Sequence, residues 1–543
     1  MADAVRTTDA GIIAGRYTAL EVFRAGPLLR ARDCAALTIP SLLPPAGATQ
    51  ATTLDTPWQS LGARGTNNLA SKLLLALFPP NSPFFRQKID DKTIMELSQD
   101  EEAKAAVENA LSQREIAIVE ELEAHGIRVP AFEMLKLLVV TGNALLFSED
   151  DGTIRIFRLD NYVVKRDPKG NVLEIVVHEK VSPLCLPEDI QVAIERVDKK
   201  PEEVVDLYTR ILRTKTNYVV TQEAAGVPIP DSFGTYPLDK SPWRPLRWAA
   251  VGGEDYGRGL AEEYMGDLQS LETLTQAIVE GAAAAARLLF LVSSGTTRIK
   301  DLQNAPNCGF VAGNKDDVHA LQVEKYADFR VALEESDRLE KRLSAAFMLN
   351  ESATRPAERV TAEEIRYMAR EIEDSFGGVY SVLSQDLQMF LVQRAQDRME
   401  SKQMLPKLPK DSVKITIITG LDALGRSHDL TKLNMFMGEM EPVADELKAR
   451  LNFLNYANRV ASGTGVDIKG LFMSDKDYAA QQAEQQNQAV MSAAMTSGAG
   501  TQVAKGIMDR MPAGAVPGTG GVAAPAGTVP GAPPAAQATP VQQ

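Results

Sequence analysis

The stretch VTAEEIRYMAREIEDSFGGVY, residues 360–380, predicts more of the architecture than any other part of the chain. Thr361 is a favourable helix N-cap, and Glu364 follows it at the spacing of a capping box. Apolar residues then recur at helical period as far as Phe390. We therefore expect one long helix that covers residues 361–404.

The middle of this expected helix holds two consecutive glycines, Gly377 and Gly378. Glycine is a poor helix former, and a glycine pair permits a sharp bend. The helix is entered from a polar loop that contains a proline, residues 350–360. A long bent helix behind such a loop indicates a mechanical part more than a catalytic site.

The composition is that of an ordinary globular protein with several domains. The chain has 543 residues, of which 44% are hydrophobic and 24% are charged. Its formal net charge is −14, with 58 Lys and Arg against 72 Asp and Glu. This acidic balance argues against a broad basic grip on nucleic acid, while passive contact with DNA stays possible. No apolar run reaches the roughly 18 residues that a membrane span needs, so no membrane partner is expected.

Helical and strand-like segments alternate along the chain. Thr56 and Gln59 have capping-box spacing around Pro57, which predicts a helix from Thr56 to the proline pair at residues 79–80. Beyond residue 479 the composition shifts to Gln, Ala, Gly and Pro, which is typical of disorder. The other expected elements are strands within residues 154–221 and 413–418, and helices over residues 92–146, 256–290, 326–349 and 421–460.

The sequence holds no convincing catalytic or cofactor-binding motif. A phosphate-binding loop is absent, and Gly257-Arg258-Gly259 lacks the third glycine of a dinucleotide fingerprint. The 3 cysteines and 4 histidines are too scattered for a metal site or a catalytic triad. We therefore expect no enzyme activity, no cofactor and no metal.

Two long stretches carry a resemblance to a known family. The first is TIPSL at residues 38–42, followed by TPWQSLGARGTNNLASKL at residues 56–73. The second is ERVTAEEIRY at residues 358–367, which leads to GGVYS at residues 377–381. These stretches resemble the T7-like podovirus portal proteins, also called head-to-tail connectors. The resemblance runs in order from about Arg16 to Leu471, with shorter matches at residues 253–258 and 347–350.

The resemblance implies a mixed α+β, mainly helical portal fold that assembles as a ring around a central channel. In sequence order the implied regions are the wing with N-terminal helices and a strand-rich part (1–255), a stem helix (256–290), the clip (291–325), a second stem helix (326–349), the channel loop (350–360), a long kinked wing helix (361–404), the crown (405–478) and a disordered tail (479–543).

The resemblance also implies a noncatalytic portal at one capsid vertex of the virion. Such a ring nucleates head assembly, docks the terminase large subunit during genome packaging, connects head to tail and lets DNA leave during ejection. The implied partners are further copies of the chain in a dodecamer, non-specific double-stranded DNA, scaffolding protein, major capsid protein, the tail adaptor protein and, as an option, internal core proteins. Assembly is expected in the host cytoplasm.

A channel lined mainly by carboxylates would repel phosphate, and a few cations would give shallow, repeated contacts. Arg355 and Arg359 in the channel loop are the candidates for such contacts, and Lys325 near the clip is a weaker one. The alternative, that these are solvated charges or intersubunit ion pairs, stays open for each. Trp58 is expected in the core, with a subunit interface as its alternative.

Two other classes of function stay open. A carboxylate–metal nuclease acting on phage DNA is the alternative, because acidic residues are numerous. It would cleave DNA in the presence of a divalent ion. A helical scaffold without a DNA channel would form no closed ring.

Overall fold

The chain forms two compact units, Met1–Val466 and Asp467–Gln543. The computed structural model describes residues 12–49, 51–79, 83–89, 101–195, 204–285, 289–292, 298–306, 309–312, 314, 316, 318–321, 326–349, 362–405, 413–417 and isolated positions beyond residue 432. In the second unit only residues 481 and 483–485 are described, and they are helical. Most of the expected crown and tail therefore lies outside the described residues.

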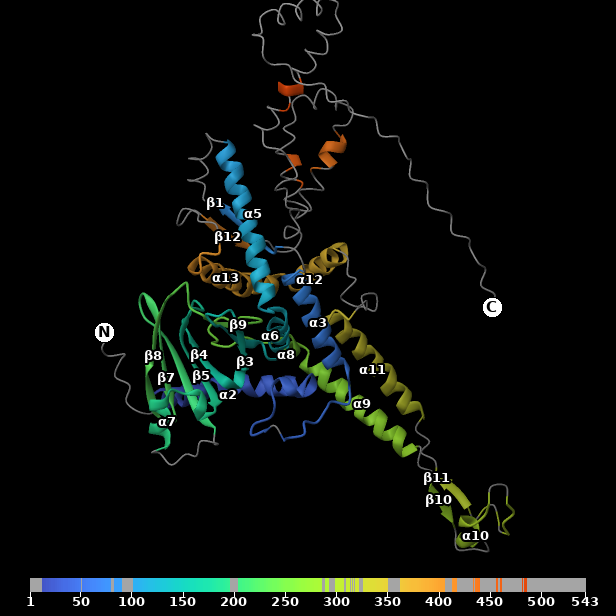
Figure 1. The fold of residues 1–543 in the computed structure, drawn as a ribbon. Helices are drawn as coiled ribbons and strands as arrows, with labels where there is room; N and C mark the ends of the chain where they lie inside the picture. The colour runs from blue at the N-terminus through green and yellow to red at the C-terminus, as the bar shows by residue number, and fades with distance from the viewer. Residues whose placement is uncertain are drawn as a thin grey trace, which may run out of the picture. The chain divides into compact units, whose positions relative to one another are not determined.

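A five-stranded antiparallel sheet carries helix α2 (Ile12–Leu37) across one face (Figure 1). Tyr17 and Leu20 of α2 pack on Val163 and Val176 of the sheet. The alternate residues of the strands point to the opposite face and join the main core. In spatial order the strands are β4 (Tyr162–Arg166), β5 (Val172–Val181), β6 (Val205–Arg213), β7 (Asn217–Ala224) and β8 (Val227–Pro237).

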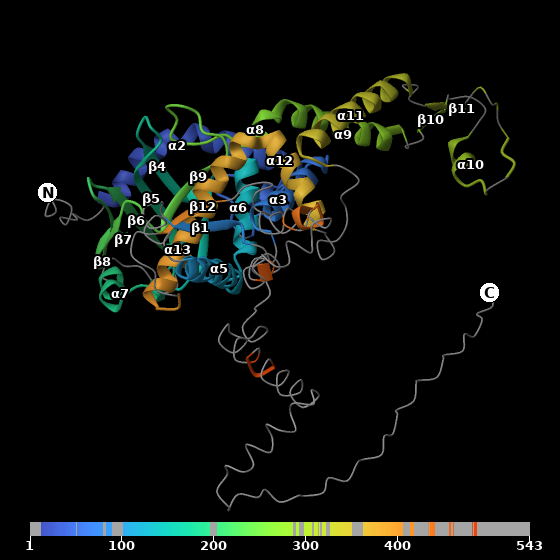
Figure 2. The same cartoon turned by 90° about the horizontal axis from the view of Figure 1, so that it is seen from above.

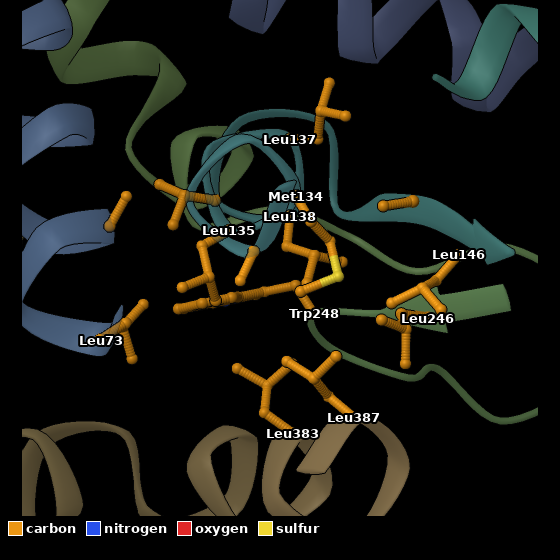
Figure 3. Close-up of a cluster of buried hydrophobic side chains, with 14 of the residues drawn as sticks. Leu73, Met134, Leu135, Leu137, Leu138, Leu146, Leu246, Trp248, Leu383 and Leu387 are labelled. Atoms are coloured by element: carbon orange, nitrogen blue, oxygen red, sulfur yellow. The ribbon is translucent and has the colours of Figure 1, made fainter. Parts of the chain in front are cut away.

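The main core lies where α3 (Leu61–Leu77), α6 (Arg128–Thr141) and a three-stranded sheet meet. Six residues of α6 between Met134 and Val140 are at most 1% exposed, because α6 is apolar on almost every side. Figure 3 shows side chains of α3, α6 and the long C-terminal helix converging around Trp248. The three strands, in the order β3-β2-β9, are β2 (Asn143–Ser148), β3 (Ile154–Phe157) and β9 (Trp243–Arg247).

A third, smaller sheet has two strands, in which β1 (Phe85–Ile89) pairs antiparallel with β12 (Val413–Ile417). Helix α5 (Glu101–Ala124) packs on β1. The strand expected at residues 413–418 is thus confirmed. The remaining short elements of this part of the chain are η1 (Pro40–Leu42), η2 (Leu159–Asn161), η3 (Pro183–Cys185) and α7 (Glu188–Glu195).

Two antiparallel helices, α9 (Met265–Ala285) and α11 (Tyr326–Ala346), lie side by side (Figures 1 and 2). Arg342 near the end of α11 pairs with Asp267 near the start of α9. The elements next to these two helices are α8 (Leu260–Glu263), β10 (Leu289–Val292), α10 (Ile299–Gln303) and β11 (Val318–Leu321), and β10 pairs antiparallel with β11.

Two expected helices differ from the structure at their ends. The helix expected over residues 256–290 begins at Leu260, is interrupted at Tyr264 and ends at Ala285. The helix expected over residues 92–146 gives way to β2 at Asn143, because this strand pairs with both β3 and β9. Tertiary pairing outweighs local helix preference at that point.

The long C-terminal helix is confirmed and is continuous through three segments. These are α12 (Ala362–Leu383), a π-helical turn (Ser384–Gln388) and α13 (Met389–Ser401). No helix of the described part combines the length and apolar character that crossing a membrane requires.

Candidate functional site: the helix that holds both ends of the predicted channel loop

The three cations predicted to contact DNA, Arg355, Arg359 and Lys325, lie outside the described residues. Thr361 lies outside them as well, and the side chain of Glu364 is not described, so their capping box stays a prediction. The helix does begin at the next residue, Ala362. The structure defines the site through the two ends that flank residues 350–361, namely the end of α11 and the start of α12.

The end of α11 turns sharply toward the predicted loop. The N–H of Met348 donates to the carbonyl of Ala345 at 3.1 Å, and the N–H of Leu349 donates to that of Ser344 at 2.7 Å. Met348 itself has a φ of 54°, the left-handed conformation that usually selects glycine. This pair of bonds with a left-handed residue is a Schellman motif, and it redirects the chain out of the helix.

Helix α3 stabilises this unusual turn from the side. The Asn68 amide donates to the carbonyl of Met348 at 2.9 Å, and Lys72 Nζ donates to the same oxygen at 2.8 Å. Asn68 also donates to the carbonyl of Phe347 at 3.2 Å. Lys72 is only 5% exposed, so its bond forms away from competing water. Two donors on one carbonyl offset the cost of a left-handed non-glycine residue, about 1–3 kcal/mol.

Close packing adds to these hydrogen bonds. A Cβ at Gly65 would lie 2.6 Å from Cγ of Phe347, whose side chain is fully buried. Only glycine allows α3 to approach the end of α11 this closely. Gly65, Asn68 and Lys72 therefore together hold Phe347 and Met348 at the end of α11.

The same helix contacts the second flank farther along, from the middle of α12 onward. Lys72 Nζ lies 3.7 Å from a carboxylate oxygen of Glu371 in α12. The Tyr380 hydroxyl donates to the carbonyl of Ala76 at 3.2 Å, and Gln388 donates to that of Leu77. Lys72 thus contacts both flanks of residues 350–361.

The bend of the long helix lies at Phe376, directly before the predicted glycine pair. Phe376 has φ −129° and ψ 26°, and its ring meets Trp248 edge-on with centroids 5.8 Å apart. Among the described residues, a Cβ at Gly377 or Gly378 would meet no neighbouring atom within 4 Å, so packing against this part of the chain does not demand these glycines. No sequence pattern predicted the π-helical turn at Ser384–Gln388.

The predicted Thr56 cap is wrong. Helix α3 begins at Leu61, because the N–H groups of Trp58 and Gln59 donate to the carboxylate of Glu272 in α9 instead of entering a helix. The Gln59 side chain supplies the cap by accepting from the N–H of Gly62 at 2.8 Å. Its amide also donates to the carbonyl of Leu37 at 2.6 Å. Trp58 is 50% exposed, so its predicted place in the core is wrong too.

The glycines of Gly257-Arg258-Gly259 serve packing. A Cβ at Gly257 would lie 2.8 Å from the carbonyl of Gly142, and one at Gly259 would lie 2.8 Å from the N of the same residue. Asn143 exchanges two hydrogen bonds with the main chain of Gly257, at 2.8 and 2.7 Å. This motif joins the end of α6 to the start of α8.

The neighbouring Asp255 and Tyr256 tie the same junction to the five-stranded sheet. Asp255 accepts from Lys165 Nζ at 2.9 Å and from the N–H of Arg166 at 2.7 Å. The Tyr256 hydroxyl accepts from the N–H of Val164 at 3.1 Å. Burial, and to a smaller extent the neighbouring charge of Arg247, lower the pKa of Arg166 to about 10. No group of three or more His, Cys, Asp and Glu side chains suited to a metal occurs among the described residues.

The sequence model of the family described as bacteriophage head to tail connecting protein matches residues 10–471. The chain belongs to this family. The portal protein of Enterobacteria phage T3 is 42% identical over 482 residues, which are 87% of this chain and 90% of that protein. The portal protein of Escherichia phage T7 is 41% identical over 502 residues, 90% of this chain and 93% of that protein. The function is therefore that of a portal protein, the head-to-tail connector of a T7-like tailed phage.

Among solved structures, the neck of an empty gene transfer agent particle aligns with this connector at a TM-score of 0.35 and 9% identity, over 68% of this chain and 84% of that chain. That similarity is too low to bear on the fold. The contacts of Gly65, Asn68 and Lys72 with Phe347 and Met348 were not predicted from the sequence. The sequence did mark both partners, because the residues of α3 and residues 347–350 both lie in stretches that carry the family resemblance.

Proposed function

We propose that the protein assembles as a dodecameric ring around a central channel for double-stranded DNA, at one capsid vertex of the virion. In this proposal residues 350–360 form the channel loop, and Arg355 and Arg359 make transient phosphate contacts. The single observation that supports the loop assignment most is the position of α3, which holds both flanks of this segment through Lys72, Asn68 and Gly65.

The pull of moving DNA explains why a channel loop would need both of its ends fixed to the core of the protein. DNA that moves through a channel pulls on each side chain that contacts it. Because α3 belongs to the main core, a load on either end of the loop passes into packed helices instead of a flexible tether. The net charge of −14 keeps non-specific attraction for DNA weak. A few arginines can then contact the DNA without stopping its movement through the channel.

The other regions follow the order of the chain. The helices α9 and α11 would form the stem, residues 291–325 the clip, residues 1–255 together with the long bent helix the wing, and residues 405–478 the crown. The proposed partners are the terminase large subunit, scaffolding protein, major capsid protein and tail adaptor protein, with internal core proteins as a further option. Assembly would take place in the host cytoplasm without any enzyme activity of this chain.

A packaging assay tests the channel loop. Capsids assembled with Arg355→Ala and Arg359→Ala protein should form normally and package less DNA than wild type. Lys169→Ala, a charge removal in the exposed turn between β4 and β5, is the matched control and should package normally. Normal packaging by both loop variants would contradict the proposed phosphate contacts. DNA cleavage by the pure protein with a divalent ion would favour the nuclease instead.

A further inference from the structure

The exposed face of α3 has a composition that neither the fold nor the anchoring of the loop explains. Arg64, Asn67 and Ser71 are exposed and lie along one side of the helix at spacings of three and four residues. They extend over roughly 10 Å of the helix axis. Among the described residues, none of these three side chains makes a hydrogen bond or ion pair.

This face offers hydrogen-bond donors and no carboxylate. The stretch from Thr56 to Ile89 contains no Asp or Glu, in a chain with 72 acidic residues. Two carboxylates that approach α3 from other elements already have partners, since Glu272 accepts from the N–H groups before α3 and Glu371 pairs with Lys72. Arg64 therefore has no counter-ion within the described part of the chain.

The face borders the root of the predicted channel loop. Asn68, which binds the carbonyl of Met348, follows Asn67 directly and lies one turn beyond Arg64. Helix α3 contacts both α11 and α12, the two helices that flank the loop (Figure 1). Arg64, Asn67 and Ser71 therefore lie on the same helix as the residues that bind the end of α11.

We propose that Arg64, Asn67 and Ser71 form a second contact surface for the phosphate backbone of double-stranded DNA, near the end of α11. This inference rests on the proposed function. Guanidinium, amide and hydroxyl donors are the groups that bind phosphate oxygens without reading sequence. One cation per subunit gives a weak contact, which repetition around a ring multiplies.

A neighbouring subunit fits this face less well than DNA does. The cores of protein interfaces are enriched in aromatic and other apolar side chains. Along α3 itself, Leu61–Leu77, no large hydrophobic side chain is exposed, and the exposed Trp58 precedes the helix by three residues. Donors without an apolar centre match the chemistry of a phosphate backbone.

The test measures binding of a short linear DNA duplex to purified rings at several salt concentrations. Arg64→Ala should keep the ring intact and weaken binding at low salt, and Arg64→Glu should weaken it further. Between 50 and 200 mM salt, the affinity for DNA falls by roughly threefold for each phosphate contact that the protein makes. A variant that lacks one contact should therefore lose less affinity over this salt range, by that same factor. Lys169→Ala is again the control and should leave binding and its salt dependence unchanged.

The outcomes separate this inference from the proposed function. Wild-type rings that bind no DNA would contradict the proposed function and this contact together. Wild-type binding that Arg64→Ala and Arg64→Glu leave unchanged would overturn this contact alone. Loss of rings in Arg64→Ala would assign the face to a neighbouring subunit and overturn the inference as well.

Discussion

Replacement of Gly65 by alanine tests how closely α3 must approach the end of α11. The added carbon would lie 2.6 Å from Cγ and 2.8 Å from Cβ of Phe347, whereas carbon atoms in contact are normally about 3.5–4.0 Å apart. Because Phe347 is fully buried, the helices must separate or the ring must leave its rotamer. Such overpacking costs about 1–3 kcal/mol. Alanine in a helix gains about 1 kcal/mol over glycine, so we expect a net loss of about 0–2 kcal/mol in the free energy of unfolding.

A matched variant isolates the packing cost. Gly15→Ala adds the same methyl group in α2, where the described part of the chain places no packing neighbour within 4 Å of it. Urea unfolding of both variants, followed by the fluorescence of the buried Trp243 and Trp248, should give free energies that differ by about 1–3 kcal/mol. Combining Gly65→Ala with Phe347→Leu should recover part of the loss, because the smaller side chain makes room. Equal unfolding midpoints for the two alanine variants would refute the close contact.

Three further predictions concern stability and reactivity. Lys72→Met should lower the free energy of unfolding by about 1.5–3 kcal/mol, because a charged, buried hydrogen bond to the carbonyl of Met348 is lost. A smaller change in urea unfolding would contradict this role of Lys72 in holding the end of α11. Gln59→Ala should destabilise by about 1 kcal/mol and Thr56→Ala by less than about 0.5 kcal/mol in the same assay, whereas the reverse order would restore the predicted Thr56 cap. Burial raises the pKa of the Cys34 thiol to about 12, so at pH 8 an alkylating reagent should modify the exposed Cys185 much faster than Cys34. Mass spectrometry of the folded protein measures both rates. Equal rates would count against burial of Cys34.

The long C-terminal helix was predictable because its signals are local. Periodic apolar residues gave its extent, and the glycine pair gave the region of the bend. The bend falls one residue earlier, at Phe376, where the aromatic ring finds Trp248. That contact joins residues far apart in sequence, so no local sequence pattern predicts it.

The wrong predictions share one physical cause. Thr56 has the spacing of a cap, but a carboxylate more than 200 residues away, on Glu272, takes the N–H groups that would have opened the helix. Asn143 continues a helical pattern, yet β3 and β9 pair with the strand that it begins. Gly65 and Lys72 likewise acquire their roles only when α11 and α12 pack on α3. Sequence patterns report local preference, and long-range partners decided these positions.

Electron microscopy of the purified protein, with class averages viewed down the symmetry axis, tests the central claim most directly. The account predicts closed dodecameric rings with a hole wide enough for a DNA duplex. Monomers or compact dimers that scaffolding and capsid proteins fail to convert into rings would contradict it.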